Sequence, residues 1–289
     1  MYGWIVVNSF VESAKFRELY SLLLDASRKV GITLDLKKGH DIISAVGDGF
    51  PSLPDFAIFW DKDIYLAQLL EEAGVRLFNS CRAIDFCDNK AKTYMALVKG
   101  GVPVPDTVIA PKTFEGLGYT DMTFLDRAID RLGLPLVIKE SYGSFGQQVY
   151  LARSRDRAVE IIGGIGHKDF VLQSFIASSE GRDLRINVVG GEVIATMYRY
   201  NDNDFRSNIS NGGSMKSYQP TEEQKAVAIK AAEVLGLDFA GVDVMFGENG
   251  SSVVCEVNSN PHFKSTMECT GVNMAEHIMG HIARTMKVR

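Results

Sequence analysis

Cysteines are scarce in this chain, and they are not spaced as metal ligands. The sequence holds four cysteines, Cys81, Cys87, Cys255 and Cys269, and no CxxC pair. A zinc knuckle needs clustered cysteines, so the pattern argues against this class of protein. Scattered thiols are typical of a reducing compartment, and we therefore expect four packed thiols in a cytoplasmic protein.

Long hydrophobic runs and an excess of positive charge are also lacking. No stretch approaches the roughly 18 apolar residues that cross a bilayer, and the segment Met1–Val7 has neither the basic residues nor the length of a signal peptide. The formal net charge is −5, whereas a nucleic-acid-binding surface is normally basic. We therefore expect no membrane and no nucleic acid among the partners.

The composition supports a folded chain of more than one unit. About 46% of the 289 residues are hydrophobic, enough for a sizeable core, and no polar tract is long enough to be disordered. This length suits two or three subdomains. We place them at residues 1–88, 89–172 and 173–289.

Strands and helices alternate in the first subdomain. Apolar residues recur at helical spacing from Val11 to Val30, and Gly31 follows as a stop signal. A second helix is predicted at Ile64–Ala73, and short apolar strands at Gly3–Asn8, Thr33–Leu36, Phe56–Trp60 and Val75–Phe78. Repeated β-α-β units predict a parallel sheet with helices on its faces.

The remainder begins as a small α+β unit and continues with longer strands. Helices are predicted at Asn89–Lys99, Phe124–Leu132, Glu222–Leu235 and from Asn273 onward. Strands are predicted at Leu136–Glu140, Val149–Ala152, Phe170–Phe175, Asp183–Val189 and Val193–Tyr200.

A β-hairpin between Gly241 and Asn258 is the most informative local pattern. Asn249-Gly250 between apolar strands predicts a type I′ turn. Counting back from a two-residue loop pairs Asp243 with Glu256. Because side chains alternate between the faces of a strand, Asp243, Glu256 and Asn258 then share one face. The other face is predicted to be core, and it holds Val242, Val244, Phe246, Val253, Cys255 and Val257.

Two carboxylates opposed on one face repel each other unless a cation or a proton lies between them. Oxygen ligands from Asp, Glu and Asn suit Mg²⁺, which keeps few protein ligands and completes its octahedron with water and phosphate. Gly241, opposite Asn258, would leave space for these groups. The alternative is an exposed polar face with a slipped register, since a four-residue loop would shift the pairing by two.

A glycine-containing turn follows an apolar strand that ends near Lys139. The turn runs from Tyr142 to Gly146, and several backbone N–H groups beside a lysine can bind phosphate oxygens. A plain hairpin turn is the alternative, because the GxxxxGK[ST] pattern is absent. The segment Gly163–Gly166 is expected to be a connecting loop.

Arginines gather in one part of this acidic chain. Arg182, Arg185, Arg199 and Arg206 lie within a short stretch, and guanidinium groups bind phosphates and carboxylates in bidentate fashion. A solvated strand face with surface ion pairs is the alternative. His277 and His281 are spaced four apart on the last predicted helix, but no third metal ligand is evident, so we expect a packing or surface role.

Taken in order, these segments resemble the ATP-grasp superfamily, and within it the RimK-like carboxylate–amine ligases that add glutamate or similar amino acids. The resemblance covers nearly the whole chain. It is densest in DFRSNISNGG (Asp204–Gly213), AAEVLGLDFAGVDVM (Ala231–Met245) and CEVNSNP (Cys255–Pro261), and FNSCRAIDFCDNKAKTYMALVKGGVPVPDT (Phe78–Thr107) looks like the helix that leads into the grasp. It implies an α/β (α+β) ATP-grasp fold, with an N-terminal parallel-sheet domain, a small central α+β subdomain and a C-terminal antiparallel-sheet subdomain.

The resemblance also implies roles for individual residues. ATP would be bound by Lys90, Lys139, Ser144, Phe145, Gly146, Gln173, Ser174, Phe175, Ile176, Asp183 and Arg185, with Gln173–Ile176 reading the adenine. Mg²⁺ or Mn²⁺ would be bound by Asp243, Glu256 and Asn258. Arg199 and Arg206, with Asn208 nearby, would neutralise the γ-phosphate and an acylphosphate.

The implied enzyme is an ATP-dependent carbon–nitrogen ligase that joins an amino acid to a peptide, a protein tail or a metabolite. Relatives often assemble as dimers or tetramers, so a homo-oligomer is expected. The alternatives are an ATP-grasp ligase of amino-acid or peptide natural-product biosynthesis and a nucleotide-binding protein without catalysis.

The sequence departs from the commoner family pattern after the metal-binding strand. Many relatives have a small residue and glycine after the proline, whereas this chain has His262 and Phe263 after Pro261. This segment should lie near the acceptor, where His262 is a candidate to orient a carboxylate or act as a base. Asn8, Ser9 and Asp61 are further candidates for the acceptor site.

Overall fold

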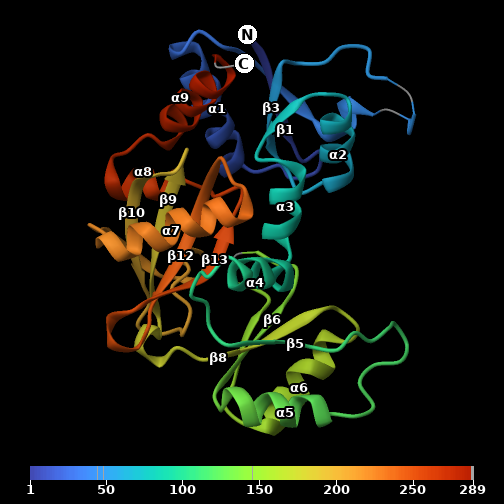
Figure 1. The fold of residues 1–289 in the computed structure, drawn as a ribbon, viewed down its shortest axis with the longest axis vertical. Helices are drawn as coiled ribbons and strands as arrows, with labels where there is room; N and C mark the ends of the chain where they lie inside the picture. The colour runs from blue at the N-terminus through green and yellow to red at the C-terminus, as the bar shows by residue number, and fades with distance from the viewer. Residues whose placement is uncertain (44, 48, 145, 288–289) are drawn as a thin grey trace.

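The computed structural model describes residues 1–43, 45–47, 49–144 and 146–287, with only the backbone of Ser210. Three β-sheets follow one another along the long axis of the molecule (Figure 1). The N-terminal sheet lies at one end, the sheet of residues 107–174 at the other, and the sheet of residues 182–258 between them. The sheet of residues 182–258 is therefore adjacent to both of the other sheets.

The N-terminal sheet is parallel, as predicted. Its order is β2-β1-β3-β4, and all of its strand pairs are parallel. The strands are β1 (Tyr2–Val7), β2 (Thr33–Lys38), β3 (Phe56–Trp60) and β4 (Arg76–Phe78), joined by α1 (Ala14–Lys29), η1 (Gly39–Ile42) and α2 (Ile64–Glu72) and followed by α3 (Cys81–Asp88). β3 is buried along its whole length, as a central strand covered on both faces must be.

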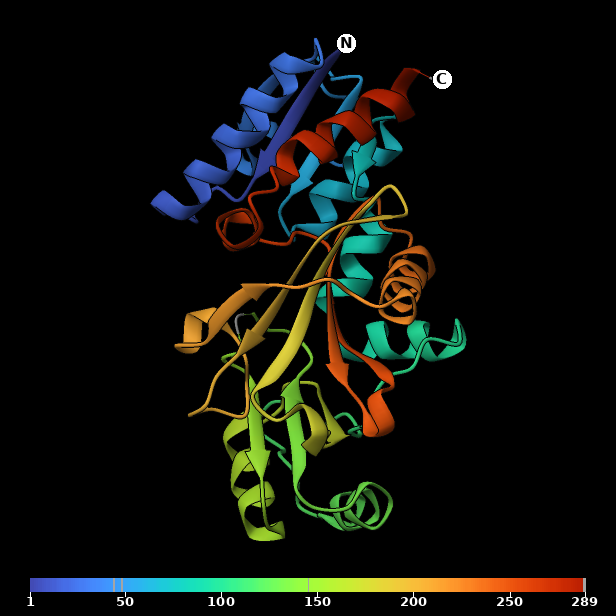
Figure 2. The ribbon, with the colours of Figure 1, turned by 90° about the vertical axis from the view of Figure 1, so that its left-hand side faces the viewer.

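The end of the chain returns to the N-terminal sheet. Helix α9 (Met274–Lys287) lies beside α1 (Figures 1 and 2). Its apolar face packs into the same core as α1, with Ile278 and Ile282 in one cluster with Leu19 and Leu23. The two ends of the chain therefore stabilise one another.

The small sheet of the central subdomain is antiparallel, with the order β5-β8-β6-β7. Its strands are β5 (Thr107–Ile109), β6 (Leu136–Glu140), β7 (Val149–Ala152) and β8 (Phe170–Ser174), covered by α5 (Thr123–Leu132) and α6 (Arg155–Ile165). The expectation of a connecting loop at Gly163–Gly166 is wrong. Gly163 and Gly164 lie inside α6, and only Gly166, with a φ of 69°, ends the helix.

The C-terminal sheet is also antiparallel, with the order β11-β10-β9-β12-β13. Its strands are β9 (Arg182–Val189), β10 (Glu192–Tyr200), β11 (Ser214–Ser217), β12 (Phe239–Phe246) and β13 (Ser252–Asn258). The connecting elements are η2 (Ala177–Ser179), η3 (Ile209–Asn211), α7 (Glu222–Leu235), η4 (Glu248–Gly250) and α8 (Lys264–Thr270). One face of the sheet packs on α7, and side chains of the other face line the cleft described below.

The division at 1–88, 89–172 and 173–289 stays a prediction, and three features bear on it. A boundary at 172/173 falls inside β8. Helix α4 (Lys90–Lys99) buries Leu97 in the core of the C-terminal sheet. Helix α9 packs on the N-terminal domain. No helix among the described residues combines the length and apolar character needed to span a bilayer.

A single buried amide ties the N-terminal domain to the C-terminal sheet. The Nδ2 atom of Asn79 donates to the carbonyl oxygens of Phe239 at 2.9 Å and Ser259 at 2.8 Å. Its Oδ1 atom accepts from the backbone N–H groups of Asp238 at 2.6 Å and Phe239 at 3.2 Å. Phe239 begins β12 and Ser259 follows β13, so Asn79 holds together the ends of both strands of the hairpin.

Replacing Asn79 by Ala is expected to destabilise the fold by about 3 kcal/mol or more. Four backbone groups would lose their partner, three of them in buried hydrogen bonds, and each buried group left unsatisfied costs about 1–3 kcal/mol. Urea unfolding followed by tryptophan fluorescence measures the change in the free energy of unfolding. Asn203→Ala, at an exposed position, is the control and should change it by less than about 0.5 kcal/mol. Equal stabilities for the two variants would contradict this role.

Candidate functional site

The hairpin of β12 and β13 brings the predicted metal ligands together. Asp243 pairs with Glu256 and Gly241 with Asn258, as the sequence predicted. Asn249 and Gly250 have φ values of 57° and 78°, as a type I′ turn requires. The pairing between the turn and Asp243 differs from the prediction, however. Phe246 pairs with Ser252, one residue away from the expected partner, and a β-bulge between Asp243 and Val244 restores the pairing.

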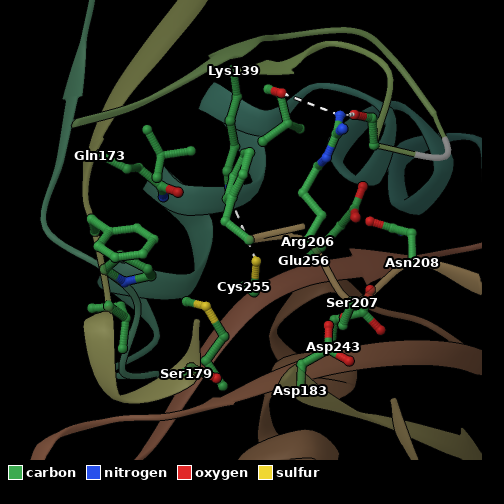
Figure 3. A pocket seen from close by; sticks show the side chains of 18 of the residues that line it. Lys139, Gln173, Ser179, Asp183, Arg206, Ser207, Asn208, Asp243, Cys255 and Glu256 are labelled. Carbon is green, nitrogen blue, oxygen red and sulfur yellow. Dashed lines mark hydrogen bonds between the residues drawn. The ribbon is translucent and has the colours of Figure 1, made fainter. Parts of the chain in front are cut away.

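The bulge also changes which residues face the cleft. The prediction that Val253 and Cys255 belong to the core face is wrong, because Val254 is the fully buried residue of this segment. Cys255 instead lines the cleft, where its Sγ atom lies 3.6 Å from Nζ of Lys139 (Figure 3). An extra residue in one strand turns two successive side chains, Cys255 and Glu256, toward the same side.

Buried charges of both signs lie at the floor of the cleft. Arg199 on β10 is 4% exposed and forms a bidentate pair with Asp183 on β9, at 2.7 and 2.6 Å. The same guanidinium lies 3.0 Å from Asp243, which is 3% exposed. Arg185 forms a second bidentate pair with Asp243. Two arginines and two aspartates thus neutralise one another inside the protein.

The pKa of Asp243 follows from this cluster. Burial acts to raise the pKa of this carboxyl group, but the charges and hydrogen bonds of Arg185 and Arg199 outweigh burial and hold it below its ordinary value. Asp243 is therefore ionised in the folded protein. It is available as an anionic ligand whenever a cation competes with the guanidinium groups.

The other two predicted ligands remain open to a cation. Among the described residues, the Glu256 carboxylate forms no ion pair or hydrogen bond with any side chain. Asn258 donates from Nδ2 to the carbonyl of Gly241 at 3.3 Å, which directs its Oδ1 atom elsewhere. Two carboxylates and an amide oxygen fit Mg²⁺. No group of three His, Cys, Asp or Glu side chains in the described ranges gathers closely enough for a metal, so water and phosphate would complete the shell.

The expectation that Gly241 leaves open space is wrong. A Cβ atom at this position would lie 2.7 Å from Cβ of Pro261 and 3.1 Å from Cδ of Arg185. The missing side chain therefore lets Pro261 and Arg185 approach the hairpin closely. Glycine is required here for packing beside the ligands.

Two lysines from different elements line the same cleft. Lys139 on β6 is buried, and its Nζ atom donates to the hydroxyl oxygen of Tyr94 at 3.1 Å. Tyr94 donates in turn to the carbonyl of Cys255 at 2.6 Å, which links the central subdomain to β13. Lys90, at the start of α4, donates from Nζ to the carbonyl of Gly143 at 3.4 Å.

The two lysines are in different electrostatic environments. Burial lowers the pKa of Lys90 below its ordinary value, although Glu256 acts in the opposite direction. Burial also acts to lower the pKa of Lys139, but Cys255, Tyr94 and Glu256 around it raise it overall. Polyanionic phosphate would stabilise both ammonium groups.

The glycine-containing turn closes over the cleft from the central subdomain. Arg206 donates from Nη1 to the carbonyl of Gly146 at 2.6 Å and pairs with Asp204 at 2.7 Å. Gly146 has a φ of 72°, and a Cβ atom there would lie 2.8 Å from Oδ1 of Asn208. Ser144 and Gly146 line the cavity with Arg206 and Asn208. Phe145 lies outside the described residues.

The same cleft extends between the two antiparallel sheets. Gln173, Ser174, Phe175 and Ile176 line a cavity of about 110 Å³ together with the lysines and acidic residues. Gln173, labelled in Figure 3, is held by its Nε2 atom, which donates to Oγ1 of Thr107 at 2.8 Å. Sequence reasoning missed further residues that line this cleft, Pro105, Val137, Ser179, Phe205 and Met245. Val137 and Met245 are apolar residues of strands, and such residues carry no local signal that they face a ligand.

A second, larger cavity of about 440 Å³ lies between the N-terminal domain and the hairpin. Asn8 and Asp61 line it, as does His262, so three of the candidates for the acceptor site lie around one cavity. Ser9 is occupied elsewhere, because its Oγ atom accepts from the backbone N–H of His40 at 2.8 Å. Of the paired histidines of α9, His281 lies 3.2 Å from Asp238, a packing role as expected.

Comparison with known proteins identifies the family. The sequence profile of the RimK-like ATP-grasp domain matches residues 87–282. The chain belongs to the RimK-like ATP-grasp family. A crystal structure of a RimK domain ATP-grasp protein from Sphaerobacter thermophilus matches the fold with a TM-score of 0.75, over 97% of this chain and 98% of that one, at 20% sequence identity. The predicted ATP-grasp fold is thus confirmed.

Two human relatives in this family are named as synthases. N-acetylaspartylglutamate synthase A of Homo sapiens is 37% identical over 213 residues, 73% of this chain and 53% of that protein. Beta-citrylglutamate synthase B of Homo sapiens is 34% identical over 225 residues, 77% of this chain and 57% of that protein. The chain spans little more than half the length of these relatives. A relative that this chain spans more fully, from Sulfolobus acidocaldarius, is named a glutamate–LysW ligase and is 30% identical over 76% of this chain and 77% of that protein, which agrees with the predicted class of enzyme.

Replacing Arg199 by Met is expected to destabilise the fold by about 3–5 kcal/mol, because two buried carboxylates would lose a shared cation. Chemical unfolding at neutral pH measures this change. Arg153→Met, which removes one partner of an exposed pair with Glu180, is the control and should cost about 1 kcal/mol at most.

The pH dependence of stability provides a second measurement of the same cluster. The folded pKa of Asp243 lies below its ordinary value of 3.8, so its contribution is present above that pH and is lost as the pH falls below it. Without Arg199 the folded pKa of Asp243 rises, and the loss of stability on acidification should be smaller than in the unaltered protein. An equal or larger acid loss in Arg199→Met would contradict this account.

Proposed function

We propose that this protein is an ATP- and Mg²⁺-dependent ligase that joins a carboxylate to an amine through an acylphosphate. The observation that supports it most is the convergence of one anionic set and one cationic set in a single cleft. Asp243, Glu256 and Asn258 offer oxygen ligands, and Lys90, Lys139, Arg199 and Arg206 line the same cavity. Such a cleft suits a polyphosphate with its metal ion.

The nucleotide would lie across the cavity between the two antiparallel sheets. The base would occupy the part of the cleft beside Gln173–Ile176, with Val137 and Met245 on its faces. The ribose would lie near Asp183 and Arg185, and the phosphates between Lys90, Lys139 and the turn of Ser144 and Gly146. Backbone N–H groups of this turn would donate to phosphate oxygens.

Asp243, Glu256 and Asn258 would hold Mg²⁺, which when bound neutralises phosphate charge and orients the γ-phosphate. Asp243 would then exchange part of its contact with Arg185 and Arg199 for the metal. The guanidinium groups released from Asp243 would lie at the edge of the cavity where a carboxylate must approach. This exchange keeps the buried charges balanced.

The reaction takes two steps. A substrate carboxylate oxygen attacks the γ-phosphorus, giving an acylphosphate and ADP. The amine of the second substrate then attacks the carbonyl carbon, phosphate leaves, and the nitrogen loses a proton. Arg199 and Arg206 would stabilise the negative charge that develops on the transferring group and on the tetrahedral intermediate. Closure of the glycine-containing turn would exclude water, which would otherwise hydrolyse the acylphosphate.

The substrates are inferred more coarsely. Both named relatives carry glutamate in the name of their product, which supports glutamate or a similar amino acid as the amine. The carboxylate would belong to a metabolite, a peptide or a protein tail. A ligase of peptide natural-product biosynthesis, or a nucleotide-binding protein without catalysis, would retain parts of the same site.

A cytoplasmic homo-oligomer remains our expectation.

ADP release in the presence of Mg²⁺ and ATP, across a panel of carboxylates and amino acids, tests the proposal. A ligase gives ADP only with a particular pair and a product lighter by one water than their sum. ATP binding without ADP release from any small pair would indicate a peptide or protein substrate. Failure to bind ATP in the presence of Mg²⁺ would contradict the proposal.

Replacing Glu256 by Gln is expected to lower turnover by at least about a hundredfold, since a metal ligand loses its charge, and to spare the fold. Glu248→Gln, at an exposed position in the turn of the same hairpin, is the matched control and should retain its turnover. Turnover and the midpoint of thermal unfolding are measured for both. Comparable turnover in the two variants would rule out Glu256 as a metal ligand.

Replacing Gly146 by Ala is expected to weaken ATP binding by about tenfold, because the added Cβ collides with Asn208 and a positive φ costs an alanine about 1–2 kcal/mol. Gly118→Ala is the matched control: its φ is 65°, and nothing lies within 4 Å of the added atom. Isothermal titration with ATP and Mg²⁺ measures both affinities. A control that weakens binding equally would show that the effect is not local to the turn.

A further inference from the structure

Lys139 is a buried cation of the nucleotide cleft whose charge no carboxylate balances directly. Its side chain, near the end of β6, is 6% exposed and lines the cavity of about 110 Å³. Its Nζ atom lies 3.1 Å from the hydroxyl oxygen of Tyr94 and 3.6 Å from Sγ of Cys255, which Figure 3 shows beside it. No ion pair joins Lys139 to an acidic side chain in the part of the chain that the structure describes. A buried ammonium group without a paired anion is costly, so its position favours an anionic ligand.

Tyr94 lies behind this lysine, on the face of α4 that also carries Lys90. The two residues are four apart on the helix, so their side chains are neighbours. Tyr94 is 3% exposed and does not belong to the lining of the cavity, whereas Lys90 and Lys139 both do. Tyr94 therefore acts on a bound nucleotide through the lining residues that its hydroxyl group contacts.

The direction of the hydrogen bonds around this hydroxyl group follows from the chemistry of its partners. An ammonium group can only donate, so the oxygen of Tyr94 accepts from Lys139. The hydroxyl hydrogen goes to the carbonyl of Cys255 at 2.6 Å, since Oε1 of Gln173 is farther away at 3.4 Å. Burial raises the pKa of Tyr94 to about 12, so the hydroxyl keeps this hydrogen near neutral pH. The chain of hydrogen bonds thus runs from Lys139 through Tyr94 to β13.

This chain of hydrogen bonds fixes the ammonium group where three elements meet. Tyr94 comes from α4, Lys139 from β6 and Cys255 from β13, and the residue after Cys255 is the proposed metal ligand Glu256. An ammonium group has three N–H bonds. Two of them are directed at Tyr94 and Cys255, which leaves the third for a ligand in the cavity. One hydroxyl group therefore connects the lysine that would bind phosphate with the strand that would bind the metal.

We propose that Tyr94 is a positioning residue of the ligase, whose hydroxyl group holds Lys139 where it binds the phosphates of the nucleotide; the proposal rests on the ligase function above. Without the hydroxyl group, the ammonium group keeps its charge but loses the acceptor that orients it. The base and the ribose are bound by other residues, so their share of the affinity stays. Tyr94 therefore strengthens the preference of the cleft for a nucleoside diphosphate or triphosphate over a nucleoside.

Displacement of a fluorescent nucleotide by ADP and by adenosine, each with Mg²⁺, tests this role. In Tyr94→Phe, the ratio of the adenosine Kd to the ADP Kd should fall about tenfold or more, because a hydrogen bond to a charged group is lost. The adenosine Kd itself should stay the same. Tyr119→Phe is the matched control and should keep the ratio of the unaltered protein. It also removes a hydroxyl group that donates to a backbone carbonyl, that of Pro111 at 2.7 Å.

A double-mutant cycle measures whether Tyr94 acts through Lys139. Because Lys139→Met already removes the ammonium group, adding Tyr94→Phe to it should change the ADP Kd by less than about twofold. The double variant also lacks the buried charge that needs the hydroxyl group, so the comparison remains available where Tyr94→Phe alone does not fold. A further loss of ADP affinity of about tenfold in the double variant would overturn the inference.

The outcomes separate this inference from the proposed ligase function. If the unaltered protein binds neither ATP nor ADP with Mg²⁺, the ligase proposal fails, and the inference with it. If it binds both and forms an amide, but Tyr94→Phe and Tyr119→Phe give the same ratio, the ligase proposal stands and the inference is overturned. An equal loss of adenosine and ADP affinity in a folded Tyr94→Phe variant, judged by its midpoint of thermal unfolding, would also overturn it. The hydroxyl group would then serve the fold alone.

Discussion

Two carboxylates on neighbouring strands, Asp243 and Glu256, face one cleft, and like charges this close are stable only with cations between or beside them. Arg185 and Arg199 bind Asp243, and the charge of Glu256 acts on Lys90 and Lys139. The cations come from β9, β10, α4 and β6, so this requirement draws the central and C-terminal subdomains onto the hairpin. A polyphosphate with its metal ion adds charges of both signs to the same place, which is why the cluster suits a nucleotide.

Contacts with the N-terminal domain hold this cluster of charged residues in place. Asn79 fixes the ends of β12 and β13 through four hydrogen bonds, and it belongs to the segment that follows the N-terminal sheet. Helix α9 brings the end of the chain back to that sheet, so the N-terminal domain is packed from two directions. The cavity beside Asp61 lies at this junction. A domain that supplies one wall of this cavity must be held rigidly against the domain that supplies the other.

Features that follow from local periodicity could be predicted from the sequence. Features that depend on contacts between residues far apart in the chain could not. The parallel N-terminal sheet follows from its β-α-β alternation, and the shared face of Asp243 and Glu256 follows from hairpin counting. The position of Cys255 in the cleft depends on a β-bulge that no residue in the segment indicates. The predicted pairing of Asp243 with Glu256 is right because the loop and the bulge shift the register in opposite senses. The partners of Asn79 lie far along the chain, so only the fold shows that this residue is a structural link, and only the fold places Asp61 in the wall of a cavity.

The central claim is that a carboxylate is activated as an acylphosphate in the cleft between the two antiparallel sheets. It is tested most directly by supplying a carboxylate labelled with heavy oxygen, together with ATP, Mg²⁺ and an amine, and analysing the released phosphate by mass. This account predicts that one labelled oxygen moves from the carboxylate to inorganic phosphate while ADP and the amide accumulate. Unlabelled phosphate alongside the amide, or AMP and pyrophosphate in place of ADP, would contradict it.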